Sequence, residues 1–297
     1  MKGALRETVS GVLLLDKPIG PSSNAVLQRA KRLLGATRAG HTGTLDPLAS
    51  GLLVIGLGEA TKFSGVLLDA DKAYRACVKL GERTATGDAE GPVLARSEAR
   101  VARDELLAIL DRFRGRIEQL PPVHSAIKHL GRPLYTYARG GESVPRSPRP
   151  IAIRRLDLEK FEGNIAVLFV ECSKGTYIRT LAEDIGEALG CGAHLAGLER
   201  TTVGPFRLEQ SITLDVLEAL SLAERRGRLL PLEALVGSRP RLVLGAHLVG
   251  KFRQGRAVSV DSPRGSVAVF DQDGAFLGTG EVDASGTLQP KRLLAQR

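Results

Sequence analysis

The sequence predicts an α+β (mixed α/β) protein, because strand-like and helix-like segments follow one another along a single chain. Apolar and polar residues alternate over 74–80, which is the pattern of a strand with one buried face. Ile165–Cys172 is strongly apolar and indicates a second strand. Over 104–113, in contrast, Leu106 and Leu110 fall at helical spacing and indicate an amphipathic helix.

Composition narrows the class of protein. The 297 residues suffice for one large domain and one small one, and a hydrophobic content of 43% supports a real core. The net charge of +9 favours a polyanionic partner such as nucleic acid, although codon bias in a GC-rich genome would also give an arginine-rich chain. The chain has no run of 18 apolar residues and no signal-peptide pattern, so we expect a cytoplasmic protein that does not contact membranes.

Metal and nucleotide sites are not expected. The three cysteines are scattered, and no Cys-x-x-Cys pair or histidine spacing suits zinc. The glycines at Gly56 and Gly58 do not form a phosphate-binding loop, because Thr61-Lys62 lacks the glycine that should precede the lysine. A dinucleotide fingerprint would need a third glycine. We therefore expect no cofactor, and, since nothing resembles a coiled coil, a monomer.

The N-terminal elements lead into a turn and a helix. Residues 9–15 are predicted to form a strand, after which Pro18 turns the chain. A helix follows, with Ser22 or Ser23 as its N-cap and Gly35 as its C-cap.

The loop 40–51 is the stretch around which the chain is organised. Its glycines and Pro47 exclude a helix interior or a plain strand, and the apolar segment 52–55 that follows is strand-like. Asp46 therefore sits on a bent polar loop that feeds a buried element, which is where functional side chains concentrate. A structural alternative is that Asp46 only makes an Asx turn before Pro47.

The middle of the chain contains a segment of different character. Residues 121–150 are rich in proline and cations and include Tyr135 and Tyr137, so the segment is either a disordered connector or an element that orders on RNA. A helix is predicted over 180–189. Arg179 lies near its start, where the helix dipole disfavours a cation, so this arginine needs a carboxylate or a phosphate as partner.

The remaining elements are predicted from shorter patterns. A strand is expected over 203–206 and a helix over 214–223. The pattern changes near residue 238, and 241–297 consists of short strands and turns, with a hairpin over 267–277.

Several motifs occur in a fixed order between about residues 9 and 206. They are VLLLDKP at 12–18, GHTGTLDPLASG at 40–51, GLGEATK at 56–62, DKAYRA at 71–76, TGD at 86–88, PPVHSAIK at 121–128, KGTYIRTL at 174–181, HL at 194–195, RT at 200–201 and GPF at 204–206. This ordered series resembles the TruB family of tRNA pseudouridine synthases. It departs from the family pattern at Ser50, at Val54 and at His124 and His129 within the segment 121–150. None of these is a catalytic position.

The resemblance implies an architecture. It implies a pseudouridine synthase fold, with a large, mostly antiparallel sheet flanked by helices, in a catalytic domain over residues 1–238. Within it, residues 121–150 would form a thumb-like insertion that grips RNA. Residues 239–297 would form a small β-barrel of PUA type that binds RNA.

The resemblance also implies a reaction, the isomerisation of uridine to pseudouridine in the T-loop of tRNA, at the position conventionally numbered 55. After base flipping, Asp46 would act as nucleophile at C1′ or at C6, or as a base in a glycal route, with Arg179 as its partner. Tyr74 would stack on the uracil. The implied substrate-binding residues are Lys17, His41, Lys128, Tyr177 and Leu198.

Two alternatives share these residues. The protein could be a noncatalytic tRNA-binding or tRNA-folding factor, although Asp46, Tyr74 and Arg179 together argue for catalysis. It could also be the guide-RNA-dependent relative that modifies ribosomal RNA, which usually carries lysine-rich tails that this chain lacks. A glycosidase would need a second carboxylate near the first, and no motif supplies one.

Overall fold

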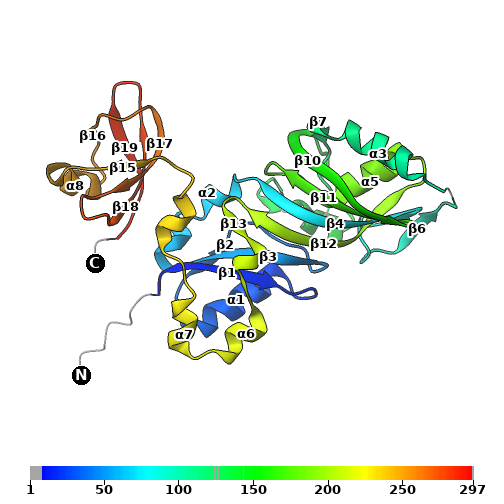
Figure 1. The fold of residues 1–297 in the computed structure, drawn as a ribbon, viewed down its shortest axis with the longest axis horizontal. Coiled ribbons are helices and arrows are strands. Elements are labelled where there is room, and N and C mark those ends of the chain that lie inside the picture. The colour runs from blue at the N-terminus through cyan, green and yellow to red at the C-terminus, as the bar shows by residue number, and fades with distance from the viewer. Residues whose placement is uncertain (1–8, 99, 124, 126, 143, 296–297) are drawn as a thin grey trace.

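Figure 1 shows one large sheet flanked by helices and a smaller sheet built from the C-terminal residues. The structure, a computed structural model, describes residues 9–98, 100–123, 125, 127–142 and 144–295, and it describes only the backbone of 128, 129, 133, 135, 138 and 139. The predicted α+β class and the mostly antiparallel sheet are confirmed. Within these described ranges, no helix has the length and apolar character needed to span a membrane.

The main sheet contains ten strands in the described part of the chain. Its order is β14-β1-β3-β12-β4-β11-β10-β7, with β2 paired to β3 and β13 paired to β12. The pairs β1–β14 and β3–β12 are parallel, and the other pairs are antiparallel. The strands are β1 (Gly11–Lys17), β2 (Ala39–His41), β3 (Ala49–Leu57), β4 (Lys72–Leu80), β7 (Gly115–Gln119), β10 (Arg149–Glu162), β11 (Ile165–Cys172), β12 (Ala193–Val203), β13 (Phe206–Arg207) and β14 (Ile212–Thr213).

Helices cover the main sheet in two places (Figure 1). α3 and α5 pack on β4, β10, β11 and β12 around a core that includes Leu168 and Ile185. α1 and α6 pack on β1 and β3 around Leu13 and Ala30. The helices are α1 (Ser23–Leu33), η1 (Gly58–Lys62), α2 (Gly65–Leu68), α3 (Arg103–Arg112), α4 (Leu134–Arg139), α5 (Ile178–Ala188), η2 (Leu208–Gln210), α6 (Leu214–Ala219), α7 (Leu222–Gly227), η3 (Leu232–Val236) and α8 (Ala246–Arg253).

The centre of the sheet brings distant motifs together. β12 lies between β3 and β4, so Arg200 stands opposite Gly51 on one side and Tyr74 on the other. Leu198 likewise stands opposite Ala49. The loop before β3 and the first residues of β4 therefore meet at one end of β12.

The predictions for the first helix and for the two central strands are confirmed. The Ser22 hydroxyl caps α1 by accepting a hydrogen bond from the Ala25 amide at 3.2 Å. The C-cap is Leu34, one residue before the predicted Gly35, whose φ of +65° ends the helix. The strands predicted at 74–80 and Ile165–Cys172 are β4 and β11.

Two predictions were wrong. No strand spans 203–206, because Gly204, with φ of +55°, turns the chain between β12 and β13. The helix predicted over 214–223 is two helices, α6 and α7. Ser221 starts the second with a capping box, since its amide donates to Glu224 Oε2 at 2.8 Å and its hydroxyl accepts from the Glu224 amide.

The segment 121–150 contains regular structure that the sequence did not indicate. It holds α4 and a small hairpin of β8 (Lys128–His129) and β9 (Arg132–Pro133). Leu134 and Tyr137 are buried, so part of the segment packs on itself. The Arg132 guanidinium stacks on the Tyr137 ring at 4.5 Å from its centroid. A further hairpin, β5 (Glu82–Thr84) and β6 (Val93–Arg96), lies apart from the main sheet.

The C-terminal residues form a five-stranded sheet with the order β15-β17-β18-β19-β16, accompanied by α8. The strands are β15 (Arg241–Val243), β16 (Val258–Ser259), β17 (Gly265–Phe270), β18 (Phe276–Val282) and β19 (Thr287–Leu293). The predicted hairpin at 267–277 is formed by β17 and β18.

A shared apolar core joins the C-terminal sheet to the rest of the protein. Phe63, which follows η1, packs against Phe276 of β18 with ring centroids 5.2 Å apart, and both belong to one buried cluster. The Glu59 carboxylate accepts a hydrogen bond from the Ala295 amide at 2.8 Å. The residues after 238 also have a core of their own, around Phe252 and Val269, and the shared cluster joins that core to the main sheet.

We expect Phe63→Ala to lower the free energy of unfolding by about 3–5 kcal/mol, because it empties a buried site shared by both sheets. Urea denaturation followed by circular dichroism measures this. Leu94→Ala on β6, where the side chain is 65% exposed, is the control and should change the value by less than about 0.5 kcal/mol. Equal effects of the two substitutions would contradict the shared core.

Candidate active site

The loop between β2 and β3 carries Asp46 and lies against β12. A Cβ atom at Gly51 would stand only 2.5 Å from the Arg200 carbonyl oxygen, and Gly51 has φ of +99°. Both facts require glycine, so the backbone of the loop can approach β12 this closely.

The start of α1 holds the loop from the other side. The Ser23 hydroxyl is buried, donates to the Leu45 carbonyl at 2.7 Å and accepts from the Leu45 amide at 2.8 Å. The Gly20 amide also donates to the Pro47 carbonyl at 2.9 Å. The residues on both sides of Asp46 are thus fixed by hydrogen bonds, which leaves the carboxylate little freedom to change direction.

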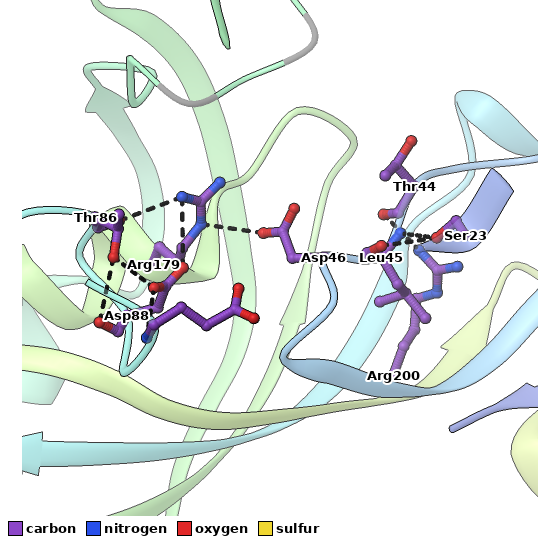
Figure 2. Close-up of polar contacts among 9 residues, drawn as sticks. Ser23, Thr44, Leu45, Asp46, Thr86, Asp88, Arg179 and Arg200 are labelled. Carbon is purple, nitrogen blue, oxygen red and sulfur yellow. Dashed lines mark hydrogen bonds and ion pairs between the residues drawn. The ribbon is translucent and has the colours of Figure 1, made fainter. Parts of the chain in front are cut away.

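Arg200 supports the same loop from beneath (Figure 2). Its side chain is buried, and its guanidinium donates to the carbonyls of Leu52 at 2.8 Å, Gly43 at 3.1 Å and Thr44 at 3.5 Å. A buried arginine satisfied by backbone carbonyls acts as a brace and also leaves a positive charge below the loop.

Asp46 forms an ion pair with Arg179 (Figure 2). Arg179 Nε lies 3.1 Å from Asp46 Oδ2, and the exposed fractions of the two side chains are 8% and 44%. The cation is therefore buried while the carboxylate faces the solvent side. Arg179 is the second residue of α5, where the sequence required an anionic partner, and Asp46 supplies one.

Asp88 is a second carboxylate beside Arg179. Its Oδ2 lies 3.7 Å from Arg179 Nη1, which also donates to the Thr86 carbonyl at 3.3 Å. Asp88 is itself held by the Thr86 hydroxyl at 2.5 Å and by the Glu90 amide at 3.1 Å. Arg179 is thus oriented from behind, which fixes the direction in which its Nε points at Asp46.

A cavity of about 300 Å³ opens beside Asp46, and volumes of this size hold small ligands. The described residues that line it are Thr42, Gly43, Thr44, Leu45, Asp46, Leu68, Lys72, Tyr74, Ser125, Ser173, Gly175, Thr176, Tyr177, Ile178, Arg179, Leu198 and Arg200. Five of the residues predicted for the site meet here. They are Asp46, Tyr74, Tyr177, Arg179 and Leu198.

Both tyrosines of the cavity are neutral near pH 7. Burial raises the pKa of Tyr74, and the charge and hydrogen bond of Arg200 act in the opposite direction. Burial also raises the pKa of Tyr177. The backbone of Tyr177 is fixed by Gln119, whose amide group bonds to its N–H at 2.8 Å and to its carbonyl at 3.0 Å. The cavity therefore presents uncharged aromatic rings beside the ion pair.

The other predicted residues lie outside the cavity lining. Lys17 is fully buried, and its ammonium donates to the carbonyls of Ala49 at 2.7 Å and Pro18 at 2.9 Å. Burial lowers its pKa, while Asp46 raises it. His41 lies in β2 with a buried Nδ1 that has no hydrogen-bond partner in the described part of the chain. The backbone of Lys128 lies in β8, and its side chain is outside the described residues.

Sequence reasoning did not assign Ser23, Lys72, Asp88 or Arg200 to the site. All four lie within or beside the ordered motifs, and this position in the sequence could have marked them as site residues. Their contacts are mostly with backbone carbonyls and amides of other segments, which a sequence pattern does not reveal.

Family models match almost the whole chain beyond residue 30. The TruB family pseudouridylate synthase N-terminal domain matches residues 31–178. The tRNA pseudouridylate synthase B C-terminal domain matches 179–237, and the C-terminal model of pseudouridine synthase II TruB matches 240–294.

Curated proteins and solved structures agree with these matches. The chain is 55% identical over 291 residues to tRNA pseudouridine synthase B of Thiobacillus denitrificans, covering 98% of this chain and 97% of that protein. The corresponding protein of Aromatoleum aromaticum is 52% identical, with 98% and 94% covered. Among solved structures, a Cbf5-Nop10-Gar1 complex matches with a TM-score of 0.76 at 28% identity, covering 97% of this chain and 85% of that chain.

We expect His41 to be mostly neutral above pH 6.5. Burial lowers the pKa of His41 from the ordinary value of 6.5, and the charge of Arg200 lowers it further. An NMR titration of the imidazole Cε1–H signal, assigned with His41→Gln, measures the midpoint. The same signal in urea-unfolded protein is the reference, since it should titrate near 6.5. A folded-state midpoint at or above the unfolded one would show that the imidazole is not shielded from water.

Proposed function

The chain belongs to the TruB family of pseudouridylate synthases, and we propose that it isomerises uridine to pseudouridine in the T-loop of tRNA, at the position conventionally numbered 55. Support for tRNA as substrate comes from relatives named tRNA pseudouridine synthase B that are about half identical over nearly the full chain. Identity and coverage this high favour the same substrate class.

The reaction needs few chemical groups. The N1–C1′ bond of uridine breaks, the uracil turns, and a C5–C1′ bond forms. The C5 proton leaves and N1 gains one, so no oxidant, reductant or cofactor is consumed. A nucleophilic carboxylate, a pocket for the flipped base and a route for the C5 proton are sufficient.

The observation that carries the proposal is the charge pattern of the cavity. Among its described lining residues, Asp46 is the one carboxylate, and it stands beside the cations Lys72, Arg179 and Arg200. A single carboxylate fits a nucleophile and does not fit the paired carboxylates of a glycosidase. The surrounding positive charge suits a nucleotide that enters with its phosphates.

In this proposal Asp46 is the nucleophile that attacks C1′ or adds to C6, or it is the base that removes the C2′ proton in a glycal route. Arg179 orients the carboxylate at the edge of the cavity through the contact at 3.1 Å. Asp88 holds Arg179 in turn.

Tyr74, Tyr177 and Leu198 form the pocket for the base. Stacking on an aromatic ring is worth about 1–3 kcal/mol per base, which offsets much of the few kcal/mol needed to unstack the target uridine. Tyr74 is a neutral phenol at pH 7, so we assign it stacking on the uracil and contact near C5.

The remaining predicted residues act on the RNA or on the loop. Lys17 holds the Asp46 loop through the Ala49 carbonyl at 2.7 Å. His41 contacts the RNA beside the flipped nucleotide as a neutral imidazole, which is consistent with its lowered pKa. Lys128, in the segment 121–150, binds phosphate.

We further propose a division of labour along the chain. Residues 1–238 form the catalytic domain, 121–150 form a thumb-like insertion that closes on RNA, and 239–297 form a PUA-like domain that adds RNA affinity.

The protein acts as a monomer in the cytoplasm and without a metal ion. No group of metal-binding side chains occurs in the residues that the structure describes.

A guide-RNA-dependent function is the second candidate, because a solved H/ACA RNP bound to a substrate RNA matches with a TM-score of 0.74. The identity to that chain is 26%, against 55% to a tRNA pseudouridine synthase B. The difference favours an enzyme that works without a guide.

Asp46→Asn should abolish pseudouridine formation and leave tRNA affinity within about tenfold, because the amide keeps the volume and loses the nucleophile. Mapping of pseudouridine in unmodified tRNA measures activity, and filter binding measures affinity. Asp111→Asn, on the exposed end of α3, is the matched control and should retain full activity. More than trace product from Asp46→Asn would refute the assigned nucleophile.

A T-arm minihelix should be a substrate with kcat close to that of whole tRNA and with a higher, more salt-sensitive apparent KM, since some phosphate contacts are lost. Replacing the target uridine with cytidine should eliminate the product without shifting it to a neighbouring uridine. Steady-state kinetics at two salt concentrations and position mapping test this. An inert minihelix alongside active whole tRNA would mean that the enzyme reads the tRNA elbow. If both were inert, the protein would instead be a guide-RNA-dependent enzyme or a noncatalytic tRNA-binding factor.

A further inference from the structure

Lys72 is a buried cation in the wall of the cavity, and the proposed reaction gives it no role beyond its positive charge. It begins β4, two residues before Tyr74, and its side chain is 8% exposed. Its ammonium donates to three carbonyls, those of Ala70 at 2.6 Å, Leu68 at 2.8 Å and Leu67 at 3.0 Å. An ammonium has three hydrogens, so its donor capacity is fully used.

The neighbouring charges do not replace these contacts. Asp69 pairs with Lys174 at 2.7 Å and Asp71 pairs with Arg154 at 2.6 Å, so both nearby carboxylates have other cations. Burial, together with the charge of Arg200, lowers the pKa of Lys72 to about 8, and at pH 7 the ammonium still carries all three hydrogens. Burying a charged group costs free energy unless hydrogen bonds compensate for the lost water. The three carbonyl contacts supply that compensation.

The carbonyls belong to the end of α2 and the turn that follows. A helix of four residues supplies few internal hydrogen bonds, so its last carbonyls need outside partners. Leu67 anchors the turn in the core beneath Phe63. Leu68 points the other way, since it is 50% exposed and also lines the cavity.

We propose that Lys72 is a positioning residue that fixes the turn 68–71, so that Leu68 forms one wall of the cavity that receives the flipped uracil. The inference rests on the proposed function and adds to it a residue that positions one wall of the same cavity. Lys72 donates to no substrate atom, because its three hydrogens are bonded to carbonyls. A substitution of Lys72 should therefore lower activity by displacing Leu68.

The test is a double-mutant cycle in kcat/KM with unmodified tRNA. Lys72→Met should lower kcat/KM by about 10- to 100-fold through misplacement of the wall. Leu68→Ala should lower it by a smaller factor. The double variant should equal Lys72→Met alone, because a released turn has no wall left to lose.

Two measurements separate positioning from folding or RNA binding. The tRNA dissociation constant of Lys72→Met should stay within about threefold of wild type, since the ammonium hydrogens are used by backbone carbonyls and make no direct phosphate contact. Lys79→Met, the same substitution on the same strand, removes only a surface pair with Glu82 and should keep activity within about twofold. If Lys72→Met does not fold, Lys72→Gln, which keeps two amide hydrogens for the carbonyls, carries the same cycle.

The proposal would be overturned if the fold-loss in kcat/KM of the double variant equalled the product of the two single losses. Full activity of Lys72→Met would also overturn it. Both outcomes can be observed only when the wild-type enzyme is active. Absence of pseudouridine with the wild type would instead refute the proposed function, so the two failures are distinguishable.

Discussion

The ion pair between Asp46 and Arg179 is the contact on which the rest of the site depends. Its partners come from a loop before β3 and from the start of α5, so it exists only when both halves of the main sheet are in place. Arg179 is buried, and a buried cation is tolerated only with a partner. Ser23 and Arg200 hold the loop, while Asp88 holds the guanidinium. Each of these contacts reduces the freedom of one end of the pair.

The cations around the cavity divide into two kinds. Arg179 meets carboxylates, whereas Lys72 and Arg200 donate to backbone carbonyls of the turns that shape the cavity. Lys17 does the same beneath the loop. Buried ammonium and guanidinium groups therefore organise irregular backbone here, and they also leave positive potential where a polyanion would enter. Burial and, to a smaller extent, the charge of Arg200 lower the pKa of His41 and so favour its neutral form.

The chain between Asp46 and Tyr74 links the cavity to the C-terminal sheet. It runs through β3 and η1, contributes Phe63 to the core shared with Phe276, and returns through α2 to β4. A common core fixes the C-terminal sheet relative to the cavity, because relative motion would expose packed aromatic surface. With the C-terminal sheet binding RNA as proposed, a fixed separation from the cavity would favour one RNA shape over others.

The sequence by itself determined the local elements with strong periodicity and the identity of the loop. The alternation before Leu80, the apolar β11 and the glycine-rich stretch around Asp46 are local properties, and the ordered motifs named the family. Tertiary structure decided what the motifs touch. That Gly204 turns the chain, that Ser221 divides a helix, and that Ser23 binds the loop and does not cap α1 follow from hydrogen bonds between particular atoms. The roles of Lys72 and Arg200 could not be predicted for the same reason: most of their partners are backbone carbonyls, which every residue carries and no sequence pattern marks.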